Sequence, residues 1–178
     1  MPTPNTGGAA APGPHAGAAE PKIIFPFSKP ALADFHTGAR FFGAPRPGRK
    51  HAAVDLIAEF GRPIHAVADG KVLRAPYFFY LGTNALEVSH PGLGTVRYGE
   101  ISIVKAVHLK GGDHVKRGDV IAYVGRLDTG SSMLHFELYA GTASGGLTNV
   151  ANPPYQRRRD LVNPTHLMER LQREAFGH

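Results

Sequence analysis

Glycine, proline, asparagine and aspartate interrupt this chain at short intervals from Ile23 to Asn163. These residues favour turns and end helices, so the segments between them are suited to short β-strands rather than to long helices. The 22 glycines and 15 prolines are far more than a helical protein tolerates. The chain is therefore expected to fold as short strands joined by many turns.

Seven segments between these turns have the composition of β-strands, and their close spacing favours an antiparallel sandwich or a rolled sheet. They are residues 52–57, 63–66, 70–75, 85–89, 94–98, 120–124 and 134–139. One helix is predicted, over about residues 163–176, because Asn163 can cap it, Pro164 suits its first position and apolar residues recur at four-residue spacing. We therefore predict an all-β fold of two antiparallel sheets with a short C-terminal helix.

The first 20 residues differ in composition from the rest of the chain. Alanine, glycine and proline make up 14 of the first 19 residues, with no valine, isoleucine, leucine or aromatic residue among them. Such a segment has no apolar side chains to bury, so we expect a disordered leader over residues 1–20 and one domain over residues 21–178. The leader lacks a basic start followed by an apolar run, so it does not resemble a secretory signal peptide.

The composition also limits the chemistry and the partners. Because the chain has no cysteine, any metal must be held by histidine and carboxylate side chains. Uninterrupted apolar runs reach only five residues, against the ~20 that span a bilayer, so no membrane span is predicted. The net charge of +6 suits a polyanionic partner. The run from Arg157 to Arg159 is weak evidence for nucleic acid, and without interleaved aromatic residues we predict no nucleic-acid partner.

His51 and Asp55 are the first candidate metal ligands. Side chains four residues apart in a strand face the same side, so these two would point together. In a straight strand they would lie about 13 Å apart. Both can reach one ion only if the backbone turns or bulges near Ala52 and Ala53.

His135 is the third candidate ligand, in the strand that ends the predicted sheet. Alternation places three apolar side chains on one face of this strand and Met133, His135 and Glu137 on the other, which predicts a half-buried strand with its apolar side in the core. Together with His51 and Asp55, His135 completes two imidazoles and a carboxylate. This donor set binds zinc in catalytic sites, where water takes the fourth position.

Four motifs occur in order between Phe41 and Leu138. They are His51-x-x-x-Asp55, Gly61-Arg-Pro-Ile-His-Ala-Val-Ala-Asp-Gly-Lys-Val72, Gly112-Asp-His-Val-Lys-Arg-Gly-Asp-Val-Ile-Ala-Tyr-Val-Gly125 and Leu134-His-Phe-Glu137. In this order they resemble the lysostaphin-type, or LytM-like, zinc peptidoglycan endopeptidases. The resemblance implies a two-sheet β fold with a groove, one zinc ion per chain on His51, Asp55 and His135, and cleavage of peptide cross-links or stems in bacterial peptidoglycan.

Two positions depart from the pattern of that family. It usually carries a histidine where this sequence has Glu100, and a His-x-His motif whose first histidine is replaced here by Met133. A thioether has no proton to donate and is only a weak acceptor. Glu100 has three open roles: general base, fourth metal ligand, or neither. His108, in a basic loop, is an alternative source of the missing imidazole.

Asn84 and Tyr98 are candidate groove residues that would hydrogen-bond a peptide, although turn formation by asparagine and core packing by tyrosine are ordinary alternatives. The leading hypothesis is a zinc-dependent metallopeptidase that hydrolyses peptidoglycan. The alternative is a catalytically degenerate LytM-like domain that binds peptidoglycan or a partner hydrolase.

Peptidoglycan lies outside the cytoplasmic membrane, so we expect action in the periplasm or outside the cell. Delivery by a specialised secretion system, as for an antibacterial effector, would explain the lack of a recognisable signal peptide. A cytoplasmic location is the alternative, and the sequence makes no prediction of oligomeric state.

Overall fold

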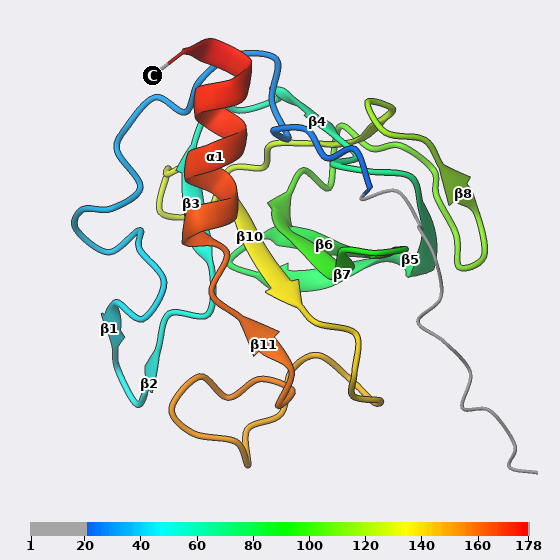
Figure 1. The fold of residues 1–178 in the computed structure, drawn as a ribbon. Helices are drawn as coiled ribbons and strands as arrows, with labels where there is room; N and C mark the ends of the chain where they lie inside the picture. The colour runs from blue at the N-terminus through cyan, green and yellow to red at the C-terminus, as the bar shows by residue number, and fades with distance from the viewer. Residues whose placement is uncertain (1–20, 178) are drawn as a thin grey trace, which may run out of the picture.

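The computed structural model describes residues 21–177, which form eleven strands and one helix (Figure 1). The predicted leader over residues 1–20 lies outside this part of the chain. No helix within residues 21–177 combines the length and the apolar character needed to cross a lipid bilayer. The elements are β1 (Pro45–Arg46), β2 (Arg49–Lys50), β3 (Val54–Ile57), β4 (Pro63–His65), β5 (Gly70–Tyr80), β6 (Thr83–His90), β7 (Gly94–Ile101), β8 (His114–Val115), β9 (Val120–Tyr123), β10 (Met133–Tyr139), β11 (Leu161–Val162) and α1 (Thr165–Phe176).

Seven strands form one antiparallel sheet in the order β11-β10-β7-β6-β5-β8, with β3 also paired to β10. Strand β10 pairs with β7 along one side, and with β3 and then β11 along the other. Strands β4 and β9 form a second, smaller sheet, and β1 and β2 form a hairpin. The prediction of an all-β antiparallel fold with a short C-terminal helix is confirmed.

Alternation along β10 divides its side chains as the sequence predicts. The apolar set lies in the core, where Phe136 packs edge-on against Tyr98 of β7 with ring centroids 5.8 Å apart. The expectation of a half-buried strand is wrong, however, because β10 is buried on both faces from Leu134 to Tyr139. The segment after β10 folds over its polar face, and Arg157 from this segment contacts Glu137.

Strand β5 continues through Tyr80, past the predicted end at Ala75. Pro76 has no backbone N–H to donate to a neighbouring strand, which argues against a regular strand at this point. The pairing of β5 with β6 shifts register between Arg74 and Tyr77, so the ladder resumes beyond the proline. The aromatic residues that follow then pair with β6.

Helix α1 begins at Thr165, and the side chain of Asn163 accepts a hydrogen bond from the Thr165 N–H at 3.0 Å. The N-cap position is Pro164, which makes no side-chain cap bond, so Asn163 lies one residue before the cap and the helix starts two residues later than expected. Phe176 at its end packs edge-on against Phe25, with ring centroids 5.6 Å apart. The apolar face of α1 thereby joins the core through buried Met168 and Leu171.

Two glycines allow backbones to approach closely beside β7. Gly94 has φ +122°, and a Cβ atom there would lie 2.1 Å from the carbonyl oxygen of Tyr139. The Gly125 N–H donates a hydrogen bond to the carbonyl of Glu100 at 2.8 Å, and a Cβ at Gly125 would lie 2.6 Å from the same oxygen. The second contact holds the end of β7 in place at Glu100.

Candidate metal centre

His51 and Asp55 converge because the chain bends at Ala53 before it enters β3. The backbone of His51 is paired with the preceding segment through Gly43 and Ala44, at 2.8 and 2.9 Å. The bend brings Nε2 of His51 to 3.2 Å from Oδ1 of Asp55. The turn that the sequence required near Ala52 and Ala53 is therefore present.

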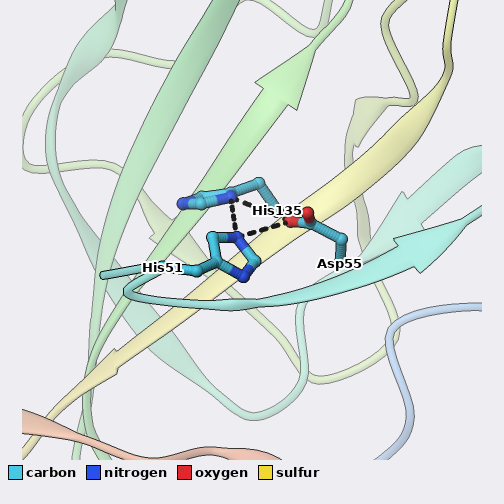
Figure 2. Close-up of side chains that lie close together, drawn as sticks. All are labelled: His51, Asp55 and His135. Carbon is cyan, nitrogen blue, oxygen red and sulfur yellow. Dashed lines mark hydrogen bonds and ion pairs between the residues drawn. The ribbon is translucent and has the colours of Figure 1, made fainter. Parts of the chain in front are cut away.

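The pairing of β3 with β10 supplies the third residue. His135 lies directly opposite Asp55 in this register, and its Nδ1 is 2.9 Å from Oδ1 of Asp55. Nε2 of His51 is 3.3 Å from the same nitrogen. Figure 2 shows the two imidazole rings and the carboxylate pointing toward one another. The donor atoms all lie within 4.8 Å of one another, and the three residues are at most 5% exposed.

Each of the three residues is held from behind by a further contact. Nδ1–H of His51 donates to the carbonyl of Phe41 at 2.9 Å, and Nε2–H of His135 donates to Glu137 at 2.8 Å. These bonds leave Nε2 of His51 and Nδ1 of His135 free to face Asp55. The second carboxylate oxygen of Asp55 lies 3.6 Å from the guanidinium of Arg46.

The charges in the cluster follow from these contacts. Burial opposes ionisation of Asp55, but the contacts of its carboxylate with His135 and His51 outweigh it and hold its pKa at about 2. Burial likewise opposes a charge on His135, yet hydrogen bonds to Asp55 and Glu137 raise its pKa to about 9. Metal binding must therefore displace a proton from His135. Two imidazole nitrogens and one carboxylate oxygen suit a divalent first-row metal ion.

Glu100 stands next to this cluster in a strained conformation. Its φ of +60° lies in the left-handed region, which costs a non-glycine residue about 1 kcal/mol or more. Regular alternation would turn Glu100 toward the core with Tyr98, but its carboxylate instead interacts with the charges of His135, Asp55 and Arg46. The positive φ explains this change of direction.

Glu100 is only 6% exposed, and its Oε2 has no hydrogen-bond partner among the described residues. Burial is the main reason that the pKa of Glu100 rises to about 7, and the negative charge of Asp55 adds to it. A buried oxygen without a partner beside a set of metal donors is free to bind a ligand or a proton.

The other residues named from the sequence lie elsewhere. Tyr98 is completely buried, and its hydroxyl bonds the backbone N–H of Val67 and Nε2 of His90, so the groove-lining role does not fit its position. His108 is exposed in the loop after β7, and it is not one of the clustered donors. Asn84 is half-buried in β6, opposite Ile101 of β7.

A layer of residues lies under His135, and no pattern in the sequence predicts it. Phe79 of β5 lies against the imidazole with ring centroids 5.4 Å apart, and the Arg97 guanidinium lies over the same phenyl ring. Glu137 is fully buried; although burial opposes its ionisation, His135 and two arginines hold its pKa far below the ordinary value. The alternation of β10 put Glu137 on the correct face, but no pattern revealed its partners.

Known proteins that are similar to this chain show the family to which it belongs. A model of the family described as Peptidase family M23 matches residues 49–147, which contain all three clustered donors. The chain belongs to peptidase family M23, and it is therefore related to metallopeptidases of the lysostaphin and LytM type, as its motifs indicated.

Two curated relatives are similar in sequence. The glycyl-glycine endopeptidase ALE-1 of Staphylococcus capitis is 32% identical over 111 residues, which are 60% of this chain and 28% of that protein. Lysostaphin of Staphylococcus simulans is 28% identical over 127 residues, 66% of this chain and 25% of lysostaphin. The chain thus matches little more than a quarter of the length of these relatives.

Solved structures agree in fold. The catalytic domain of lysostaphin from Staphylococcus simulans superposes with a TM-score of 0.56 at 23% identity, covering 74% of this chain and 90% of that domain. A structure of LytU gives a TM-score of 0.55 at 27% identity, covering 81% of this chain and 95% of LytU. The fold is that of the lysostaphin catalytic domain.

Proposed function

We propose that this protein is a zinc-dependent endopeptidase that cleaves peptide cross-links or stems of bacterial peptidoglycan. The observation that carries the proposal is the convergence of two imidazole nitrogens and a carboxylate oxygen from His51, Asp55 and His135 within 4.8 Å. Membership of peptidase family M23 and similarity to a glycyl-glycine endopeptidase support the reaction and the substrate class.

One zinc ion per chain would be held by His51 Nε2, His135 Nδ1 and an oxygen of Asp55. When bound there, zinc polarises a carbonyl group and lowers the pKa of a coordinated water. The hydrogen bonds to Phe41 and Glu137 fix the tautomers that present these nitrogens.

Glu100 is our candidate general base. Its unpartnered Oε2 would accept a proton from the attacking water, and a carboxyl pKa of about 7 in the metal-free protein suits a base that works near neutral pH. This role would compensate for Met133, whose thioether cannot exchange a proton. Glu100 as a fourth ligand, and His108 as the source of an imidazole, are the alternatives that the experiment separates.

The substrate also sets expectations for the surroundings of the centre. Asn84 is proposed to hydrogen-bond the peptide from β6. Action is proposed in the periplasm or outside the cell, where peptidoglycan lies, with delivery as an antibacterial effector as one route. The net charge of +6 suits an anionic cell wall.

The test measures release of new amino groups from purified peptidoglycan, together with zinc content, for the parent and three variants. We expect His135→Ala to lose both zinc and cleavage. Glu100→Gln should keep its zinc and lose about 10²- to 10⁴-fold in rate, the usual contribution of a general base. His108→Ala, which alters an exposed side chain, should cleave at the parental rate.

The other results are equally informative. Cleavage by Glu100→Gln at the parental rate would rule out the base, and loss of zinc from this variant would identify Glu100 as a ligand. A parent that sediments with cell walls but releases no amino groups would instead be a binding domain, the degenerate alternative.

A further inference from the structure

A buried charged cluster lies under the metal centre and connects it to the C-terminal part of the chain. Its central residue is Glu137, which has no exposed surface. Four side chains donate hydrogen bonds to its carboxylate, namely those of His135, Arg97, Tyr139 and Arg157.

The two carboxylate oxygens of Glu137 have different partners. Oε2 accepts from Nη1 of Arg97 at 3.1 Å and from the hydroxyl of Tyr139. Oε1 accepts from Nε2 of His135 at 2.8 Å and from Nε of Arg157 at 2.9 Å, and Nη2 of Arg157 lies 2.9 Å from the same oxygen as an ion pair. Arg157 therefore donates to the same Glu137 oxygen that accepts the hydrogen bond of the candidate ligand His135.

The segment that contains Arg157 also contacts the residues that precede His51. Beside it, Nε2 of Gln156 reaches the carbonyl of Gly48 at 3.4 Å, and Tyr155 stacks on Phe42 with ring centroids 4.7 Å apart. These contacts fall on the residues that precede His51. Arg157 itself is 8% exposed, so water does not replace its contacts.

We infer that Arg157 is a positioning residue for the metal centre: by fixing Oε1 of Glu137, it sets the orientation in which His135 presents Nδ1 to the metal. The inference rests on the proposed zinc site and extends it beyond residue 147, where the family match ends. An arginine suits this place because its planar guanidinium directs two N–H groups at one carboxylate in a fixed geometry, which a lysine cannot do.

The neighbours of Arg157 show that the three consecutive arginines have separate environments. Arg158 pairs with Asp160 through Nε at 2.6 Å, whereas Arg159 is exposed. The run is therefore not one cationic strip, which further weakens its connection with nucleic acid. Arg159 provides a matched control, since its substitution removes the same charge two residues away.

The experiment compares the parent with Arg157→Gln, Arg157→Lys and Arg159→Gln. The zinc dissociation constant is measured by competition with a chromophoric chelator, and the urea midpoint of each metal-free protein is measured in EDTA. We expect zinc binding to weaken about 10-fold in Arg157→Gln, the lower end of the usual cost of losing an outer partner of a metal ligand, because Arg157 acts through Glu137. Arg157→Lys should fall between this variant and the parent, and Arg159→Gln should stay within about 2-fold of the parent.

A purely structural role predicts a different result. The urea midpoint of metal-free Arg157→Gln would fall while its zinc dissociation constant stayed parental, and that outcome would overturn the inference. If Arg157→Gln does not fold, Arg157→Lys decides by the same two measurements. Failure of the parent to bind zinc would refute the proposed function and the inference together, whereas equal zinc binding by parent and variants would refute only the inference.

Discussion

The carboxyl group of Glu100 is expected to make the metal-free protein less stable as the pH rises. Its pKa is raised from 4.5 to about 7, so the folded state favours the protonated form. This stabilising preference is fully present below pH 4.5 and is lost as the pH rises through 7. At about 1.4 kcal/mol per pKa unit, ionised Glu100 reduces the free energy of unfolding by about 3 kcal/mol at high pH.

The substitution Glu100→Gln removes the titration and nearly keeps the shape. We expect the free energy of unfolding of the variant, relative to that of the parent, to increase by about 3 kcal/mol when the pH is raised from about 4 to 8.5. Both values are measured by urea denaturation in EDTA. Any constant cost of burying the amide cancels in this difference. Glu174→Gln serves as the control, because Glu174 is 55% exposed on α1 and should show no such change.

An equal difference between parent and Glu100→Gln at both pH values would refute the reasoning. It would mean that the Glu100 carboxyl is not desolvated in solution, and the argument for a base active near neutral pH would lose its physical support. A gain of the expected size would instead mark Glu100 as a residue that lowers stability at the candidate site.

Three further predictions concern the core, the backbone and the metal. Tyr98→Phe removes the hydroxyl that bonds His90 and a buried backbone N–H. The free energy of unfolding, measured by urea denaturation, should therefore fall by about 1–3 kcal/mol, and peptidoglycan cleavage should stay unchanged. Slower cleavage without a loss of stability would instead support a role for Tyr98 in binding the peptide. Gly94→Ala should destabilise the protein by at least ~2 kcal/mol in the same assay, because its Cβ would lie 2.1 Å from the carbonyl oxygen of Tyr139. A variant as stable as the parent would contradict this. Zinc should raise the thermal midpoint more at about pH 8 than at about pH 6. The reason is that His135, with a pKa of about 9, must release a proton before it binds zinc, and this release is easier at the higher pH. A rise in the midpoint that is independent of pH would contradict this.

The strands and the donor residues were largely predictable from local pattern. Alternation correctly separated His135 and Glu137 from the apolar face of β10, and the spacing of His51 and Asp55 required a bend that the structure contains. Their convergence was not predictable from the spacing. It depends on the register that sets His135 opposite Asp55, a pairing across 80 residues of chain.

Two features of the site were not predictable from the sequence, for reasons of backbone conformation and burial. Tyr98 and Glu100 should share a face by alternation, but the positive φ of Glu100 breaks the period, so only Glu100 turns toward the donors. Arg157 belongs to a basic run that, as a sequence feature, indicates no contact with the metal centre. Its burial on Glu137 depends on how the segment after β10 folds back, which charge patterning along the sequence does not encode.

The packing of Phe25 against Phe176 brings two distant parts of the chain together. His36 adds a second contact with α1, since its Nε2 lies 2.8 Å from a carboxylate oxygen of Glu169. Removal of α1 would therefore take Met168 and Leu171 out of the core and uncover the buried ring of Phe25.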